Sequence, residues 1–97
     1  MTAVSRFRAA LVVRGIWPSR IVLFGSYVTG RAHEWSDIDL VVVSDDFAGR
    51  DVWERIQLLS PAICDADAPI EAIGLTPAEW EKKDSLAAQF AADGVEV

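Results

Sequence analysis

Residues 37–43 read D-I-D-L-V-V-V, so the second half of this segment is apolar at every consecutive position. A strand that is apolar on both faces is typical of a central strand covered on both sides of a sheet. Two further short strands are expected, one over residues 20–24, which run into Gly25, and one over residues 69–74. The sequence therefore predicts an α/β (α+β) domain, in which a small mixed sheet is flanked by helices on one or both faces.

One helix is expected before the first two strands in the sequence, and a second helix after them. Apolar positions recur at helical spacing over residues 2–14, and Gly15 follows as a natural C-terminal stop. Asp51 and Glu54 form the reciprocal capping pattern that predicts a helix over residues 52–59. We expect Val52, Ile56 and Leu59 to face inward and residues 61–68 to be irregular.

The remaining segments complete the expected order of elements. Thr76 and Glu79 give a second capping pattern, which predicts one helix over residues 77–92. Residues 95–97 are expected to form a tail or a small edge strand. Residues 26–36 lack a sustained apolar period and are expected to be mainly a loop, with one possible helical turn over residues 26–29.

Length and composition exclude several classes of protein. The chain has 97 residues, which predicts a single domain over residues 1–97. A net charge of −6 argues against broad nucleic-acid binding. A single cysteine, Cys64, cannot form an internal disulfide, so the cytoplasm is the default compartment. The longest apolar run, residues 9–13, is far too short to span a membrane.

Acidic residues at the start of the expected central strand carry the strongest chemical signal. Side chains alternate along a strand, so Asp37 and Asp39 project from the same face. Glu71 in the third expected strand joins them only if the strands pair in a suitable register, and is otherwise an exposed edge residue. Clustered carboxylate oxygens suit Mg²⁺ or Mn²⁺, with substrate phosphates and waters as the remaining ligands.

A Gly-Ser turn follows the first expected strand. Gly25 has no Cβ, which lets a phosphate approach the backbone, and the Ser26 hydroxyl is an additional donor. The turn lacks both the Gly-Lys-Ser/Thr of the P-loop and the Gly-x-Gly-x-x-Gly of dinucleotide-binding folds. We interpret it as a phosphate cradle facing the Asp-x-Asp pair.

These residues resemble the nucleotidyltransferases of the DNA polymerase β superfamily, especially their minimal single-domain prokaryotic members. The segment from Gly25-Ser26 through ten intervening residues to Asp37-Ile38-Asp39 is similar to the G-S-x10-D-x-D signature of that superfamily. The weaker resemblance extends to residues 76–80 and so covers most of the chain. It implies the polymerase-β-type nucleotidyltransferase fold.

The resemblance also implies the roles of the site residues. Asp37 and Asp39 would bind two divalent cations, Mg²⁺ or Mn²⁺, and Glu71 would take the place of the third carboxylate, usually Asp in the family. Gly25 and Ser26 would hold the β- and γ-phosphates. Arg31 could compensate for Thr29, which stands where many relatives carry a basic residue. The implied reaction is transfer of a nucleoside monophosphate, AMP from ATP, to an acceptor hydroxyl.

Partners are implied by the size of the chain and by the resemblance. Larger relatives hold the acceptor with an additional domain, for which this chain has no room. Minimal relatives are often encoded beside a small helical protein of the HEPN type, with which they form a toxin–antitoxin pair. A homo-oligomer is the other expected assembly.

Other interpretations remain open from the sequence. One is a non-catalytic or weakly catalytic NTP-binding module that acts by covering a partner. A metal-dependent nuclease is weaker, because the net charge and the Gly-Ser turn count against it. Trp17, Trp53, Trp80 and Cys64 are expected to pack in the structure, and His33 is expected to be solvated. Trp35 could instead face a base or a partner.

Overall fold

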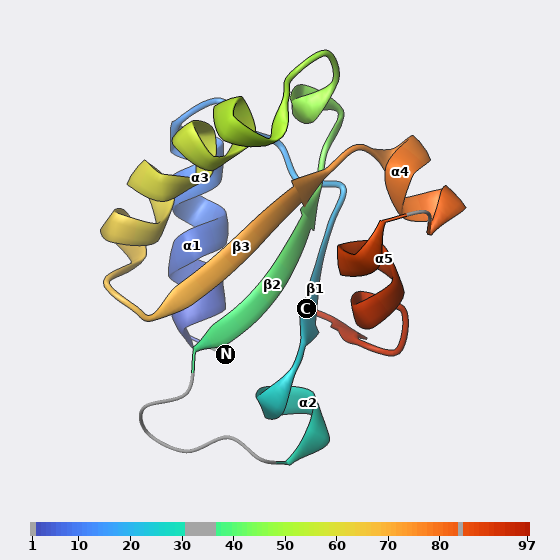
Figure 1. Ribbon diagram of the computed structural model, residues 1–97. Coiled ribbons are helices and arrows are strands. Elements are labelled where there is room, and N and C mark those ends of the chain that lie inside the picture. Colours follow the sequence, from blue (N-terminus) through green and yellow to red (C-terminus); the bar gives the residue numbers. More distant parts are fainter. Residues whose placement is uncertain (1, 31–36, 84) are drawn as a thin grey trace.

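The computed structural model describes residues 2–30, 37–83 and 85–97. Its centre is a four-stranded sheet with the strand order β3-β2-β1-β4 (Figure 1). β1 pairs antiparallel with β2 and with β4, whereas β2 pairs parallel with β3. The mixed sheet confirms the expected fold class. The strands are β1 (Arg20–Phe24), β2 (Ile38–Val43), β3 (Ile70–Leu75) and β4 (Val95–Glu96).

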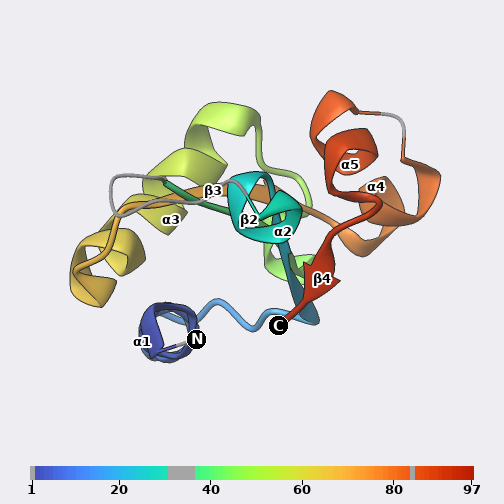
Figure 2. The ribbon, with the colours of Figure 1, turned by 90° about the horizontal axis from the view of Figure 1, so that it is seen from below.

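Helices cover both faces of this sheet, as Figure 2 shows from below. α1 lies on one side and contacts α3, while α4 and α5 lie on the opposite side. α2 follows directly after β1 at one end of the sheet (Figure 1). None of the helices in the described residues is long and apolar enough to cross a membrane. The helices are α1 (Thr2–Val13), α2 (Ser26–Thr29), α3 (Val52–Ala66), α4 (Pro77–Lys82) and α5 (Leu86–Ala91), with a 3₁₀ turn at Asp45–Phe47.

β2 is buried on both faces, which explains its unbroken apolar run. Leu40 and Val42 lie in the larger core with α1 and α3. Val41 and Val43 lie in a second core with Trp80 and the small residues of α5. Both cores therefore depend on the strand that the sequence marks most clearly.

The expected end of the second helix is wrong, because α3 continues through Pro61 to Ala66. Proline lacks the N–H that would bond to the preceding turn. Ala62 and Ala66, beyond the proline, are nevertheless completely buried in the core, and α3 packs along α1. This packing explains why α3 continues beyond Pro61, although proline usually ends a helix.

The expected orientation of the first turns of α3 is also wrong. Leu59 is buried as predicted, but Val52 and Ile56 are exposed. Trp53 beside them is exposed as well, contrary to its expected packing role. Trp17 and Cys64 are also exposed, whereas Trp80 is buried as expected.

The single helix expected over residues 77–92 is two helices. Lys83 adopts a left-handed conformation with φ 54°, which ends α4. Ser85 then caps α5 by accepting a hydrogen bond from the N–H of Ala88. The break lets the two short helices turn across the sheet, and Val95–Glu96 returns as the small edge strand that the sequence allowed.

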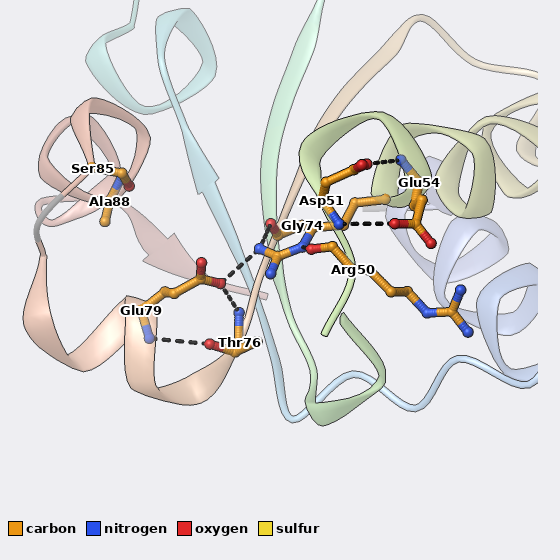
Figure 3. A network of polar contacts seen from close by, with 9 residues as sticks. Arg50, Asp51, Glu54, Gly74, Thr76, Glu79, Ser85 and Ala88 are labelled. Atoms are coloured by element: carbon orange, nitrogen blue, oxygen red, sulfur yellow. Dashed lines mark hydrogen bonds and ion pairs between the residues drawn. The ribbon is translucent and has the colours of Figure 1, made fainter. Parts of the chain in front are cut away.

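Arg55 of α3 links this helix to β3 and α4, and Figure 3 labels the residues that it binds there, Gly74 and Glu79. Nη1 of Arg55 donates to Oε1 of Glu79 at 2.6 Å and to the carbonyl oxygen of Gly74 at 3.1 Å. Oε1 of Glu79 also accepts from the N–H of Thr76, completing the predicted capping box. Although partial burial opposes it, the Thr76 N–H and the Arg55 guanidinium hold the pKa of Glu79 below its ordinary value.

This network predicts a pH-dependent loss of stability in Glu79→Gln. A carboxyl with a lowered pKa in the folded state stabilises the fold above its ordinary pKa of 4.5, and this contribution disappears as the pH falls through the folded value. We expect the variant to lose about 1–2 kcal/mol of unfolding free energy at pH 7 and progressively less towards pH 3. Urea titrations at several pH values measure this difference.

Glu81→Gln is the matched control for this prediction. It removes an exposed carboxylate from the same helix and should leave the unfolding free energy nearly unchanged. An equal loss for Glu79→Gln at pH 7 and pH 3 would contradict the ionic origin of the effect.

Candidate active site

Strand register brings three of the expected site positions to one end of the sheet. Phe24 of β1 is paired with Asp39 of β2, so Gly25 lies directly beyond this pair. On the other side of β2, Asp39 is paired with Glu71 of β3. Because the latter pair is parallel and in register, Asp39 and Glu71 project from the same sheet face.

This face is open at the acidic end and covered at the other end. Val41 and Val43 follow Asp39 on the same face and are buried beneath α4 and α5. Asp39 itself is only partly buried, and Glu71 is exposed. The short helices therefore leave the carboxylates accessible to a ligand.

The carboxylates of Asp37, Asp39 and Glu71 interact electrostatically. Burial, followed by the charge of Asp37, raises the pKa of Asp39. The charge of Asp37 is the largest cause of the raised pKa of Glu71, followed by desolvation and by the charge of Asp39. Asp37 lies just before β2 rather than within it, and is exposed. The structure thus brings the three acidic residues together.

Their chemistry fits a divalent cation. Carboxylate oxygens are the preferred ligands of Mg²⁺, and mutually repelling carboxylates are stabilised by a cation between them. Within the described ranges, however, no three acidic, histidine or cysteine side chains are already arranged to hold a metal ion. Mg²⁺ usually keeps several waters and shares substrate phosphates, so a partial set of protein ligands is compatible with it.

Position 25 requires glycine because of its backbone conformation and because of the nearby side chain of Asp39. Its φ of 77° and ψ of −147° lie in a region that residues with side chains rarely adopt. A Cβ at this position would stand 2.3 Å from Oδ2 of Asp39. The sequence suggested a glycine for phosphate approach, but did not reveal this contact, because it depends on the pairing of β1 with β2.

The other expected nucleotide-binding positions are described only in part. Ser26 begins α2 and is partly buried, and Thr29 ends that helix. Arg31 lies outside the described residues, as do His33 and Trp35. Their expected roles therefore stay predictions.

Comparisons with known proteins agree with the fold and with the sequence motif. The sequence model of the nucleotidyltransferase domain matches residues 4–92, nearly the whole chain. The protein therefore belongs to the nucleotidyltransferase domain family, and its class is that of a transferase of nucleoside monophosphate groups. No curated protein matches the chain significantly in sequence.

A solved structure shares the fold. It is a crystal structure from Sulfolobus solfataricus, described as a candidate nucleotidyltransferase, with 19% sequence identity to this chain. The match has a TM-score of 0.62 and covers 99% of this chain and 86% of that one. At 19% identity, this structural similarity supports only the fold. The family assignment depends on the match of residues 4–92 to the sequence model of the domain.

The contact between Gly25 and Asp39 predicts a severe effect of Gly25→Ala. The new methyl group must displace the Asp39 carboxylate or shift the turn, in addition to backbone strain, so we expect a loss of about 2–4 kcal/mol of unfolding free energy. Gly49→Ala is the control, because Gly49 also has a positive φ of 75° but nothing lies within 4 Å of its added Cβ. Equal losses in chemical denaturation would show that strain alone matters.

Repulsion among the carboxylates predicts that Glu71→Gln stabilises the metal-free protein. The raised pKa means that the folded state disfavours the charged form of Glu71, so neutralising it removes a cost that is present at pH 7. We expect the melting temperature in EDTA to rise by about 2–4 °C. Glu81→Gln controls for the change in net charge, and a lower melting temperature for Glu71→Gln would show that its carboxylate stabilises the fold.

Proposed function

We propose that this protein transfers a nucleoside monophosphate, AMP from ATP, to an acceptor hydroxyl in a reaction that depends on Mg²⁺. One observation carries the proposal: Asp39 and Glu71 are paired in register beside Gly25 in a chain of the nucleotidyltransferase family. The resemblance of its G-S-x10-D-x-D segment to the polymerase β superfamily supports the metal and the nucleotide. Mn²⁺ is the alternative cation.

In this proposal the three acidic residues and the turn have separate tasks. Asp37, Asp39 and Glu71 would hold the divalent cations, which would neutralise the phosphates and make the acceptor hydroxyl more acidic. The backbone at Gly25 and the side chain of Ser26 would position the β- and γ-phosphates, with help from Arg31. Placement of the triphosphate at this end of β1 would direct its α-phosphorus towards the acidic face.

The proposed chemistry is an in-line displacement. The acceptor oxygen forms a bond to the α-phosphorus, while the bond from this phosphorus to the bridging oxygen of the β-phosphate breaks. Pyrophosphate leaves, and the carboxylate of Glu71 takes the hydroxyl proton. Glu71 is exposed, so its carboxylate is accessible to the acceptor hydroxyl.

The acceptor is proposed to be a hydroxyl on a partner protein. The short helices α4 and α5 leave the acidic end of the sheet open, and a partner would present the acceptor to this open face. A small helical HEPN-type protein would fit the resemblance, with this chain as the antitoxin of a cytoplasmic toxin–antitoxin pair. A non-catalytic NTP-binding module is the second candidate, favoured by a glutamate in the place of the usual aspartate.

Intact-mass spectrometry tests the proposed transfer. The purified protein is incubated with Mg²⁺ and each NTP, with and without the product of the neighbouring gene. We expect a mass gain of one AMP on the partner with ATP, abolished by EDTA and reduced at least about 10³-fold in Asp37→Asn/Asp39→Asn. The control Asp45→Asn/Asp93→Asn also removes two exposed carboxylates and should retain transfer.

Two results would count against this proposal. A stable complex with no mass gain on either protein would favour the non-catalytic module. A mass gain that persists in Asp37→Asn/Asp39→Asn would place the chemistry elsewhere on the chain.

A further inference from the structure

A small cavity of about 330 Å³ opens at the outer edge of β3, further along the strand than Glu71. α3 forms one wall, while Glu79 of α4 and the start of α5 form the other. Its volume is at the low end of small-molecule sites, and is suited to a few apolar side chains rather than to a nucleotide. The apolar residues that line it are Val52, Ile56, Leu59, Ala72, Ile73 and Ala87.

Exposed apolar residues line this cavity or stand next in sequence to residues that line it. Val52, Ile56 and Ile73 line it, yet are 73%, 43% and 40% exposed. Trp53 follows Val52 and is 65% exposed, and Leu86 lies between the lining residues Ser85 and Ala87 and is 71% exposed. We call Val52, Trp53, Ile56, Ile73 and Leu86 the apolar patch. Several exposed apolar residues gathered at one cavity are typical of an interaction site.

The charges within the cavity are already paired. Arg55 and Glu79 both line it and bind each other at 2.6 Å. Arg55 also donates to the carbonyl oxygens of Arg50 and Gly74. A partner therefore needs to supply apolar contacts rather than a compensating charge, and two acidic copies of the chain can meet here without adding a buried unpaired charge.

We propose that the apolar patch joins two copies of this chain around a two-fold axis. The cavity lies beside large exposed side chains of the same patch. In a two-fold dimer, Trp53 or Leu86 of each copy could therefore insert into the cavity of the other copy. Each exposed side chain presents roughly 100 Å², so the five present on the order of 500 Å². This is most of the roughly 800 Å² that each partner buries in a stable interface.

The dimer would border the site without taking part in its chemistry. Ile73 lies two residues beyond Glu71 on the same face of β3, a distance of about 7 Å along the strand. The inference does not rest on the proposed transfer, because it concerns only surface packing. Its test is accordingly independent of nucleotide, metal and acceptor.

Sedimentation equilibrium of the full chain, at concentrations from about 1 to 200 µM, tests the dimer. We expect the mass to rise from one chain to two. Val52→Lys should weaken the association by at least tenfold, because it places a charge in the apolar interface. Val13→Lys is the matched control, because it changes an exposed valine at the end of α1 by the same charge and should dimerise normally.

A second variant tests the cavity itself. Ala87→Phe fills the hole from a partly exposed helix position and should also weaken the dimer by at least tenfold, with an unchanged circular-dichroism spectrum. A wild-type protein that stays monomeric at 200 µM would overturn the proposal. It would also be overturned if Val52→Lys and Ala87→Phe, both folded, dimerise as the wild type does.

Discussion

The structure depends on the position of β2, which is hydrogen-bonded to a strand on each side and covered by helices on both faces. Its second half is entirely apolar and lies between the two cores, while Asp39 lies near its start and Asp37 directly precedes it. A single strand thus supplies both the centre of the fold and the centre of the candidate site. The change from one to the other occurs where α4 and α5 stop covering the sheet.

Clustering like charges at this point opposes folding. The charge of Asp37 is the main cause of the raised pKa of Glu71, whereas burial comes before the charge of Asp37 as the cause of the raised pKa of Asp39. A cation bound between these carboxylates would remove the repulsion. The same repulsion that opposes folding would therefore favour the metal binding proposed above. The rest of the molecule compensates through the apolar cores and through the Arg55 network at the opposite end of β3.

Much of the fold and site could be predicted from local patterns. The strands, the capping boxes and the Gly-Ser and Asp-x-Asp motifs all depend on residues close together in the sequence. The errors concern long-range packing: α3 passes Pro61 because Ala62 and Ala66 are buried against other elements, and Val52 faces outward although its spacing fits an inward face. The partnership of Asp39 with Glu71 needed the strand register, which no local pattern determines.

The register of β3 against β2 is fixed by contacts at Gly74, near the end of β3 that lies away from Glu71. Gly74 packs so closely on Phe47 that a Cβ would stand 2.9 Å from its ring, and its carbonyl accepts from Arg55. Shifting β3 by one residue would bring Ile73 or Leu75 into a place where only glycine fits. The same shift would turn Glu71 to the opposite face of the sheet, because side chains alternate. A packing constraint between α3, β3 and the 3₁₀ turn therefore determines where the third carboxylate of the candidate site lies.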